Sequence, residues 1–483
     1  MSSTSSSTLS SLGVGSGIDA NSIITQLMAI ERRPIAQLQS AASDLDTKLS
    51  TYGKVQSYVD TLGTAAKALN DPALWRAMSA SSSDSTSLGV TAADGATAGS
   101  YSVQVGTLAA AQMTAGTAVA STTTAIGQGT LHIDIGSWAA DNSSFTPKSG
   151  STTVDIDIGP GEDTLQAIRD KINAKTDLGV RASIVNDATG ARLVLQSTTT
   201  GVANGFRVQV SDDDGNDADA SGLSRLSYDP ANGAAVATRS QAAANASATI
   251  NGLTVQSATN TLSDVIDGVT LTLTKPTTSP VTVSVSANTA SMRSAITSFV
   301  KVYNDLMSNL RTQTAYNADS KTGGPLQGDQ TALSIQRQVR MAFSAESSAS
   351  SVFARASDLG LTLQKDGSIS TSSSKLDAAL TKPSELQKFF TASGTGSVGI
   401  GLAQRVNTLT AALLGTDGAI TSREDGLRKL KTLNSDRQQQ LEDRASATEA
   451  RLRKQYQALD TNMARLTSLS NYVSQQITNW NKA

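Results

Sequence analysis

Three glycines near the start of the chain, Gly13, Gly15 and Gly17, are spaced like the first part of a phosphate-binding loop. A dinucleotide loop requires G-x-G-x-x-G directly after a buried strand, because its backbone N–H groups must approach the pyrophosphate where a helix begins. Here a serine-rich segment precedes the glycines, and the pattern is not completed after them. We therefore expect no nucleotide site, but a flexible hinge at the three glycines and a following helix capped by Asp19 or Asn21.

A second segment with residue types suited to chemistry is SDDDGND, residues 211–217, which has the composition of a calcium-binding loop. An EF-hand needs glycine at its sixth position and glutamate at its twelfth, for a sharp turn and a bidentate ligand. Counted from Asp212, these positions hold Asp217 and Leu223. We interpret the segment as a solvated turn and expect no metal site.

The remaining candidates for catalysis are His132 and the two acids Asp155 and Asp157. His132 is the single histidine and the chain has no cysteine, so a zinc site or a serine triad would need unusual partners. The two acids alternate on the polar face of a predicted strand, where a glycosidase pair is possible but an ordinary exposed surface is more common. We find no constellation typical of an enzyme, and we expect neither catalytic activity nor a cofactor.

The composition limits the partners. The 483 residues carry 39 Lys and Arg against 41 Asp and Glu, a formal net charge of −2, and no basic stripe. This balance argues against nucleic acid binding, which depends on clustered cations. No apolar run approaches the ~18 residues of a membrane span, and the N-terminus lacks a secretory signal. We expect no nucleic acid partner, no membrane insertion, and either a cytoplasmic protein or one exported by a route that reads no such signal.

Long helices are predicted at both ends of the chain. Residues 23–70 have a helical pattern, interrupted near its start by Pro34, with an apolar residue every seven positions. From Arg423 a second helical pattern continues almost to the end without a proline, and five apolar residues from Leu452 to Trp480 are spaced seven apart. The two helices are expected to pair in antiparallel orientation.

One pair of helices cannot bury all of this apolar surface. We expect the stripes from Leu38 to Leu69 and from Leu452 to Trp480 to stay uncovered in a single chain, which requires a multimer or a docking partner. The residues predicted to bind a partner are Leu27, Ile30, Leu38, Leu45, Leu49, Leu452, Tyr456, Leu459, Met463, Leu466, Val473, Ile477 and Trp480.

Strands are predicted between the two helical ends. Residues 79–130 and 238–289 alternate apolar and polar side chains, and the Asn-Gly pair at 251–252 is a strong hairpin signal. These two stretches most simply pair with each other, which nests residues 131–237 between them as an α+β insertion. Within the insertion we expect one short helix with Asp163 as its N-cap.

Four stretches carry a family resemblance. In chain order they are GVGSGIDANSIITQLMAIERRPI; INGLTVQSATNTLSDVIDGVTLTL followed by SAITSFVKVYNDL; LGLTLQKDGSISTSSSKLDAAL; and EARLRKQYQALDTNMARLTSLSNYVSQQI. They resemble, in the same order, segments of the flagellar filament cap proteins, the hook-associated protein 2 family. The match is weakest over residues 131–237.

The resemblance implies a multidomain α+β fold with nested parts. It implies an antiparallel terminal coiled-coil leg domain (1–40 and 430–483), a helical domain (41–78 and 290–429), a β-rich head domain (79–130 and 238–289), and an outer α+β head domain (131–237) inserted in the inner one.

The same resemblance implies a mechanical function. The family forms a ring homo-oligomer, most commonly a pentamer, that caps the filament tip, retains exported flagellin and promotes its folding and insertion beneath the cap. The implied partners are flagellin, the hook-filament junction protein and a flagellar export chaperone. The implied location is extracellular, at the flagellar filament tip, after secretion through the type III export channel. In this interpretation the uncovered stripes dock to flagellin or to neighbouring caps, and the three glycines form the hinge ahead of the first docking helix.

The sequence leaves alternative functions open. Another axial flagellar protein, flagellin or a junction protein, also has helical ends but would polymerise into a filament or a junction. A cap with an additional adhesin role would bind a mucin or another host glycan through residues 79–290. A hydrolase is opposed by the missing catalytic constellation.

Overall fold

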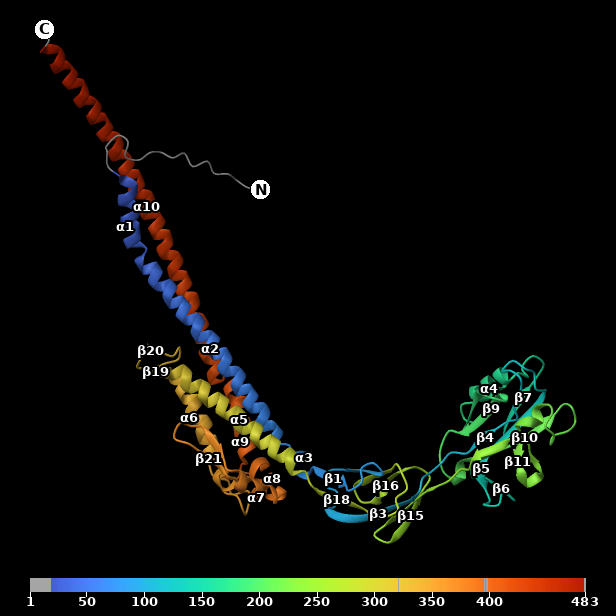
Figure 1. Ribbon diagram of the computed structural model, residues 1–483. Coiled ribbons are helices and arrows are strands. Elements are labelled where there is room, and N and C mark those ends of the chain that lie inside the picture. Colours follow the sequence, from blue (N-terminus) through green and yellow to red (C-terminus); the bar gives the residue numbers. More distant parts are fainter. Residues whose placement is uncertain (1–18, 320, 395, 397, 482–483) are drawn as a thin grey trace. The chain divides into compact units, whose positions relative to one another are not determined.

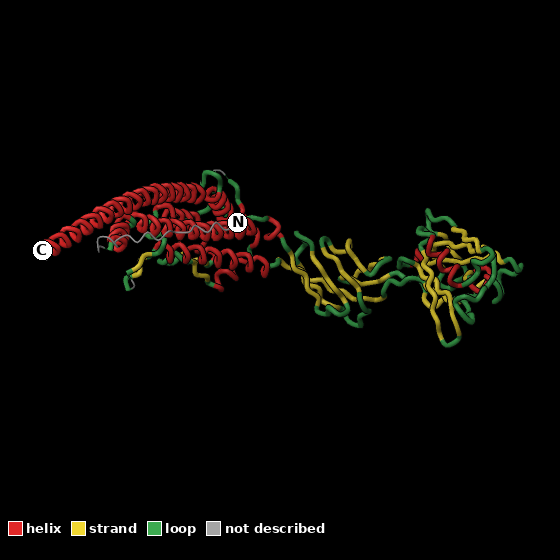
Figure 2. The backbone as a smooth tube through the Cα atoms, turned by 90° about the horizontal axis from the view of Figure 1, so that it is seen from above, coloured by secondary structure: helices red, strands yellow, loops and turns green. Residues whose placement is uncertain are grey.

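The computed structural model describes residues 19–319, 321–394, 396 and 398–481. The chain divides into two compact units. Unit 1 comprises residues 1–74 and 289–483, and unit 2 comprises residues 75–288. Helices dominate unit 1 and strands dominate unit 2, as Figures 1 and 2 show, so the expected mixture of helix and sheet is confirmed.

Unit 1 is built on helices from both ends of the chain. The first two are α1 (Ala20–Glu31) and α2 (Arg33–Leu69), separated at Arg32, with Pro34 in the first turn of α2. Proline fits there because the first N–H groups of a helix have no intrahelical partner. The side chain of Asp19 accepts a hydrogen bond from the Ser22 backbone N–H at 3.0 Å, which confirms the expected N-cap of α1.

The longest helix of unit 1 is α10 (Ala419–Trp480), whose 62 residues extend over about 90 Å. It runs alongside α2 and α1 in antiparallel orientation (Figure 1). Further α-helices among the described residues are α5 (Thr289–Thr314), α6 (Gln330–Ser344), α7 (Ser373–Leu380), α8 (Pro383–Thr391) and α9 (Leu402–Leu414), and the short α3 (Pro72–Arg76) lies at the boundary with unit 2. Two small hairpins complete the unit: β19 (Tyr316–Asn317) with β20 (Thr322–Gly323), and β21 (Leu361–Leu363) with β22 (Ile369–Thr371).

One part of unit 2 is a pair of antiparallel sheets with a shared apolar core. The larger sheet has the order β1 (Met78–Ser82), β18 (Val281–Ala287), β3 (Gly99–Thr107), β14 (Ala246–Ile250), β15 (Leu253–Ser257). The smaller sheet has the order β16 (Thr261–Ile266), β17 (Val269–Leu273), β2 (Leu88–Ala92). Strands from before and after the nested segment therefore pair as expected. The predicted hairpin is confirmed, with positive φ at Asn251 and Gly252 between β14 and β15.

The nested segment has its own core between two further sheets. The first follows the order β12 (Ala234–Ala235), β11 (Tyr228–Asp229), β10 (Gly205–Asp212), β5 (Gly129–Trp138), β6 (Phe145–Pro147), and β7 (Val154–Ile158) also pairs with β5. The second follows the order β13 (Thr238–Gln241), β4 (Met113–Ala115), β9 (Gly190–Ser197), β8 (Val180–Asp187). This second sheet includes two strands outside residues 131–237. β4 precedes that segment, β13 follows it, and the two strands pair with each other.

A single α-helix, α4 (Leu165–Ala174), packs Leu165, Ile168 and Ile172 into this core. The expectation that Asp163 caps it is wrong. The cap is Thr164, whose hydroxyl accepts a hydrogen bond from the Ala167 backbone N–H at 3.2 Å. The helix therefore begins one residue later than an Asp163 cap would place it, and threonine is a good N-cap because its hydroxyl can accept from a backbone N–H of the first turn.

Candidate docking surface

The N-terminal part of α10 is bonded to the rest of unit 1 through the buried carboxylate of Asp329. The Tyr52 hydroxyl donates to Asp329 Oδ1 at 2.6 Å, and Arg423 donates Nη2 and Nε to Oδ2 at 2.8 and 3.1 Å. The backbone N–H groups of Thr331 and Ala332 also donate to Oδ1, so the same carboxylate caps α6. One side chain thus joins α2, α6 and α10.

The charge state of Asp329 follows from these bonds. Burial by itself raises the pKa of the carboxyl, but the hydrogen bonds from Tyr52 and Arg423 outweigh burial and hold the pKa below its ordinary 3.8. Burial and the bond to Asp329 raise the pKa of the Tyr52 hydroxyl, so it stays a donor. The junction is therefore stable in its charged form at neutral pH.

Further along, α10 pairs with the first helix of the chain. Ile24 and Met28 of α1 are buried with Ala445, and Leu452 and Tyr456 pack against this cluster. Arg32 at the end of α1 adds ion pairs to Glu442 at 3.2 Å and Glu449 at 3.7 Å. Arg32 and Glu442 are about half exposed and Glu449 is 28% exposed, and such solvent-accessible pairs contribute at most about 1 kcal/mol each. Burial of the apolar cluster therefore contributes most of the free energy that holds α1 against α10.

Beyond this cluster, α10 is uncovered in the part of the chain that the structure describes. Every residue from 465 to 479 is exposed. Five large apolar residues on one side of this end form what we name the terminal stripe: Leu459 (43% exposed), Leu466 (59%), Leu469 (59%), Val473 (47%) and Ile477 (53%). Their spacing of three, four and seven residues places them along one face.

The sequence interpretation predicted four members of the terminal stripe but missed Leu469. Tyr472, which is 59% exposed beside the stripe, was also missed. Leu469 lies three residues after Leu466, a helical spacing that a strict seven-residue search passes over. Both residues enlarge the apolar surface.

The other predicted binding residues occupy different environments. In α1, Leu27 and Ile30 are 39% and 61% exposed. Leu38, Leu45, Leu49, Leu452, Tyr456 and Met463 are half-buried. The Trp480 side chain and the proposed hinge Gly13, Gly15 and Gly17 lie outside the described residues and side chains. The role of these residues in docking stays a prediction.

The expectation that the stripe from Leu38 to Leu69 is uncovered is wrong for its second half. Tyr52, Val59, Leu62 and Leu69 are fully buried. The reason is that α5 and α9 of the same chain pack on this part of α2. A seven-residue repeat has the same appearance whether its cover is another chain or a distant part of its own.

The uncovered end of α10 (residues 465–480, the free end) differs in charged-residue content from the part of α10 that pairs with α1 and α2. Residues 466–481 contain no Asp, Glu, Lys or Arg, whereas residues 423–454 contain many. A helix that remained in water would be expected to carry charge on its solvent face, and charged residues are depleted where protein surfaces become buried in interfaces. The free end has the composition of a helix that is enclosed by partners.

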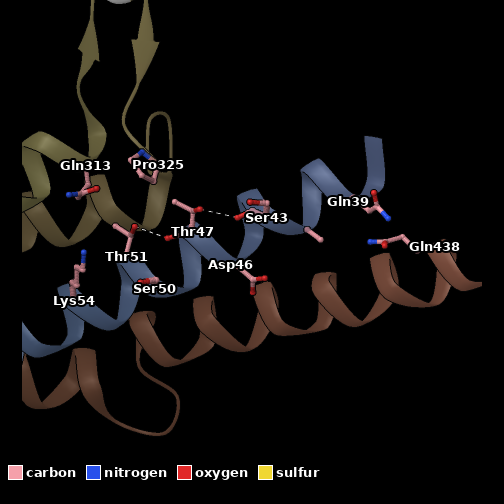
Figure 3. A pocket seen from close by; sticks show the side chains of 11 residues that line it. Gln39, Ser43, Asp46, Thr47, Ser50, Thr51, Lys54, Gln313, Pro325 and Gln438 are labelled. Carbon is pink, nitrogen blue, oxygen red and sulfur yellow. Dashed lines mark hydrogen bonds between the residues drawn. The ribbon is translucent and has the colours of Figure 1, made fainter. Parts of the chain in front are cut away.

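A polar groove adjoins the paired part of α2 (Figure 3). Its volume is about 730 Å³, and side chains of α2 line it together with Gln313, Pro325 and Gln438. Asp46 in the groove pairs with Lys431 of α10 at 2.5 Å, and the Thr47 hydroxyl bonds the Ser43 carbonyl. The lining offers hydroxyl and amide groups for hydrogen bonding, and its one carboxylate, Asp46, is already engaged by Lys431.

One arrangement in unit 2 has the order of a catalytic triad. His132 Nδ1 lies 2.7 Å from Asp155 Oδ1, and His132 Nε2 lies 3.1 Å from Ser211 Oγ. Sequence reasoning missed Ser211 because strand pairing of β5 with β10 brings it across 79 residues. The three side chains lie on a sheet face where Asp155 is 60% exposed and Asp157 adds negative charge. An acyl-transfer oxyanion needs preorganised donors, and acids disfavour it, so the geometry gives little support to a hydrolase.

The described residues offer neither a metal cluster nor a membrane-spanning helix. No group of three or more His, Cys, Asp and Glu side chains is placed to hold a metal ion within that part of the chain. Across the same residues, no helix combines the length and apolarity needed to cross a membrane.

Comparison with known families identifies three matching regions. Residues 16–112 match the model described as "Flagellar hook-associated protein 2 N-terminus", and residues 243–468 match "Flagellar hook-associated protein 2 C-terminus". Residues 144–199 match "Flagellin hook IN motif", which lies in the nested segment.

Full-length relatives and a solved structure agree with these matches. The chain is 33% identical to flagellar hook-associated protein 2 of Escherichia coli K12, over 98% of each chain. It is 31% identical to B-type flagellar hook-associated protein 2 of Pseudomonas aeruginosa, over 95% of each. The crystal structure of the flagellar cap protein FliD D1-D2-D3 domains from Escherichia coli is similar with a TM-score of 0.60 and 32% identity, covering 78% of this chain and 99% of that one.

Proposed function

Because the chain belongs to the flagellar hook-associated protein 2 family, whose members cap the flagellar filament, we propose that the free end of α10 is the part that holds the growing filament tip. The observation that carries this proposal is the terminal stripe, which is exposed and which, from Leu466 to residue 481, lies among uncharged residues. Burying a fully exposed leucine contributes roughly 1.5–3 kcal/mol, and these five side chains are only about half exposed, so one stripe supplies a modest docking energy.

The partner of the stripe is flagellin at the filament tip, with neighbouring copies of this chain as further contacts. The cap is a ring of identical subunits, most commonly five, and it also meets the hook-filament junction protein. Before secretion the chain is held by a flagellar export chaperone, and it leaves the cell through the flagellar export channel to reach the tip. The family assignment supports a location at the bacterial flagellum, and these finer steps rest on the family's way of working.

The work of the cap is mechanical, and we infer no enzymatic role. A ring with several docking helices binds by avidity, so one helix can detach and rebind while the others hold. A short stripe on each subunit suits this use, because each contact is individually weak. Flagellin retained beneath the ring then folds and inserts at the position that a detached helix has opened.

The alternative of a flagellin or a junction protein is not favoured, since the relatives are named hook-associated protein 2.

The experiment that tests this function is deletion of the gene in its host, followed by measurement of swimming and of flagellin in the medium. The expected mutant is non-motile and sheds unpolymerised flagellin, and a plasmid copy restores both properties. Normal filaments on the deletion cells would contradict the proposal.

A further inference from the structure

Three polar side chains on neighbouring strands of unit 2 form an ordered chain of hydrogen bonds. His132 lies on β5, which pairs with β7 on one side and with β10 on the other. Asp155 of β7 lies directly opposite His132, and Ser211 of β10 lies two residues along from the position opposite it. Residues that are opposite or two positions apart share one face of a sheet, so strand pairing places all three side chains together.

The partners of His132 determine which ring nitrogen carries the proton. Nδ1 lies 2.7 Å from Asp155 Oδ1, and because a carboxylate offers only acceptors, Nδ1 is the protonated nitrogen. In the neutral imidazole Nε2 is then an acceptor, and Ser211 Oγ lies 3.1 Å from it. The Ser211 hydroxyl therefore donates to the nitrogen that can remove its proton. This is the contact between a nucleophile and its general base, with Asp155 as a positioning residue.

The contact is accessible, and acids surround it. Ser211 is exposed, and its imidazole partner is 30% exposed. Asp155 is 60% exposed, Asp157 lies two residues further along the same strand, and residues 213–214 add two exposed acids next to the serine. A concentration of negative charge repels an anionic acyl donor and leaves a neutral donor unaffected.

The same acids separate acylation of the serine from hydrolysis of the product. Both steps pass through an oxyanion, which nearby carboxylates disfavour. Attack on an activated ester is still driven by its good leaving group, whereas the serine ester that results has only a poor one, the serine alkoxide. The acyl group should therefore stay on the protein, which agrees with the little support that the geometry gives to a hydrolase.

We propose that Ser211 is an acylation site for neutral activated esters. Its Oγ forms a bond to the acyl carbon, the bond from that carbon to the leaving oxygen breaks, and the leaving oxygen takes the bonding electron pair. His132 Nε2 takes the hydroxyl proton and passes it to the departing oxygen. The product is an O-acyl serine in unit 2, and its formation does not depend on the terminal stripe of unit 1.

The test is incubation of the full-length protein with p-nitrophenyl acetate, followed by tryptic digestion and mass spectrometry. Ser211 lies in the tryptic peptide 208–225, and Ser183, an exposed serine of β8, lies in the peptide 182–192 and serves as an internal reference. We expect acetylation of Ser211 to exceed that of Ser183 by about tenfold or more. Acetyl phosphate, which is anionic, should acetylate Ser211 no more than Ser183.

Variants assign the roles of the three side chains. His132→Gln should lower the acetylation of Ser211 by about 100-fold, because it removes the general base. Asp155→Ala should lower it by about tenfold or more, and Asp155→Glu, which keeps a carboxylate, should restore part of it. Ser183→Ala is the matched control and should leave the acetylation of Ser211 unchanged. Thermal unfolding shows that each variant is folded before its acetylation is compared.

Three results would overturn the proposal. The first is acetylation of Ser211 at the same rate as the reference serine, and the second is wild-type acetylation in His132→Gln, because either would show an ordinary hydroxyl. The third is acetylation by acetyl phosphate at the rate of the neutral ester, because the surrounding acids would then have no influence on the donor.

Discussion

The carboxylate of Asp329 joins α2, α6 and α10, so its removal affects the root of the long helix. Asp329→Ala deletes the cap of α6 and leaves the Arg423 guanidinium and the Tyr52 hydroxyl without their shared acceptor. Arg423 is 35% exposed, so the loss comes mainly from the cap of α6 and from the buried hydrogen bonds, and we expect the unfolding free energy to fall by about 2–4 kcal/mol. Denaturant unfolding measures it. Asp305→Ala, which breaks an exposed pair with Lys301, is the control and should change stability by less than about 1 kcal/mol.

The same substitution has a pH dependence with a definite sign. The folded protein holds the pKa of Asp329 below its ordinary 3.8, so the ionised carboxylate stabilises the fold above that value. This contribution is lost as the pH falls through the lowered folded pKa. The difference between the wild type and Asp329→Ala should therefore be constant near neutral pH and shrink below about pH 4. A difference that grows on acidification would show that the charged form is not the stabilising one.

Two glycines of α2 form a matched pair. A Cβ at Gly63 would lie 2.8 Å from Thr410 Oγ1 of α9, whereas a Cβ at Gly53 would meet nothing within 4 Å. Gly53→Ala should stabilise the protein by about 0.5–1 kcal/mol, because alanine favours the helix. Gly63→Ala should destabilise it by about 1 kcal/mol, since overpacking outweighs the same gain. Equal thermal shifts for the two variants would mean that α2 and α9 are not in close contact.

At the level of elements, the structure separates a covered from an uncovered part of α10. Isolated helices are marginal in water, so the end beyond the α1 contact should open readily in a single chain. Trypsin should cut first after Arg465, and more slowly after Arg437 and Arg444 in the paired part. The measurement is mass spectrometry of the fragments, at a dilution where the protein is shown to be monomeric. Cleavage at all three sites at the same rate would argue against a difference in cover.

Most helices and strands could be predicted from the sequence, but the elements that bury their apolar faces could not. Periodicity and the Asn-Gly turn identified α2, α10 and the β14–β15 hairpin, because these depend on neighbouring residues. The burial of Tyr52 and Leu62 depends on α5 and α9, which lie hundreds of residues away in sequence. The contact between Ser211 and His132 could not be predicted either, because it depends on the pairing of β5 with β10, which no local pattern reveals.

At the scale of the whole molecule, the candidate site is a surface without a catalytic group. Its strength comes from the number of subunits, because several weak stripes in one ring bind together. The sequence predicted the position of this surface from the apolar repeat. It could not predict which half of the N-terminal repeat the chain would cover itself.

The terminal stripe is tested most directly by the double substitution Leu459→Asp and Leu466→Asp, expressed in cells that lack the native gene. Both leucines are exposed, so the variant should fold with an unchanged unfolding midpoint. Asn471→Asp combined with Gln475→Asp is the matched control, because it adds the same two charges to the opposite face of the same helix end. The readout is unpolymerised flagellin in the medium, with swimming as a second measure. We predict shed flagellin and lost motility for the double variant and wild-type behaviour for the control; attached filaments and normal swimming with the double variant would contradict the docking role of the stripe.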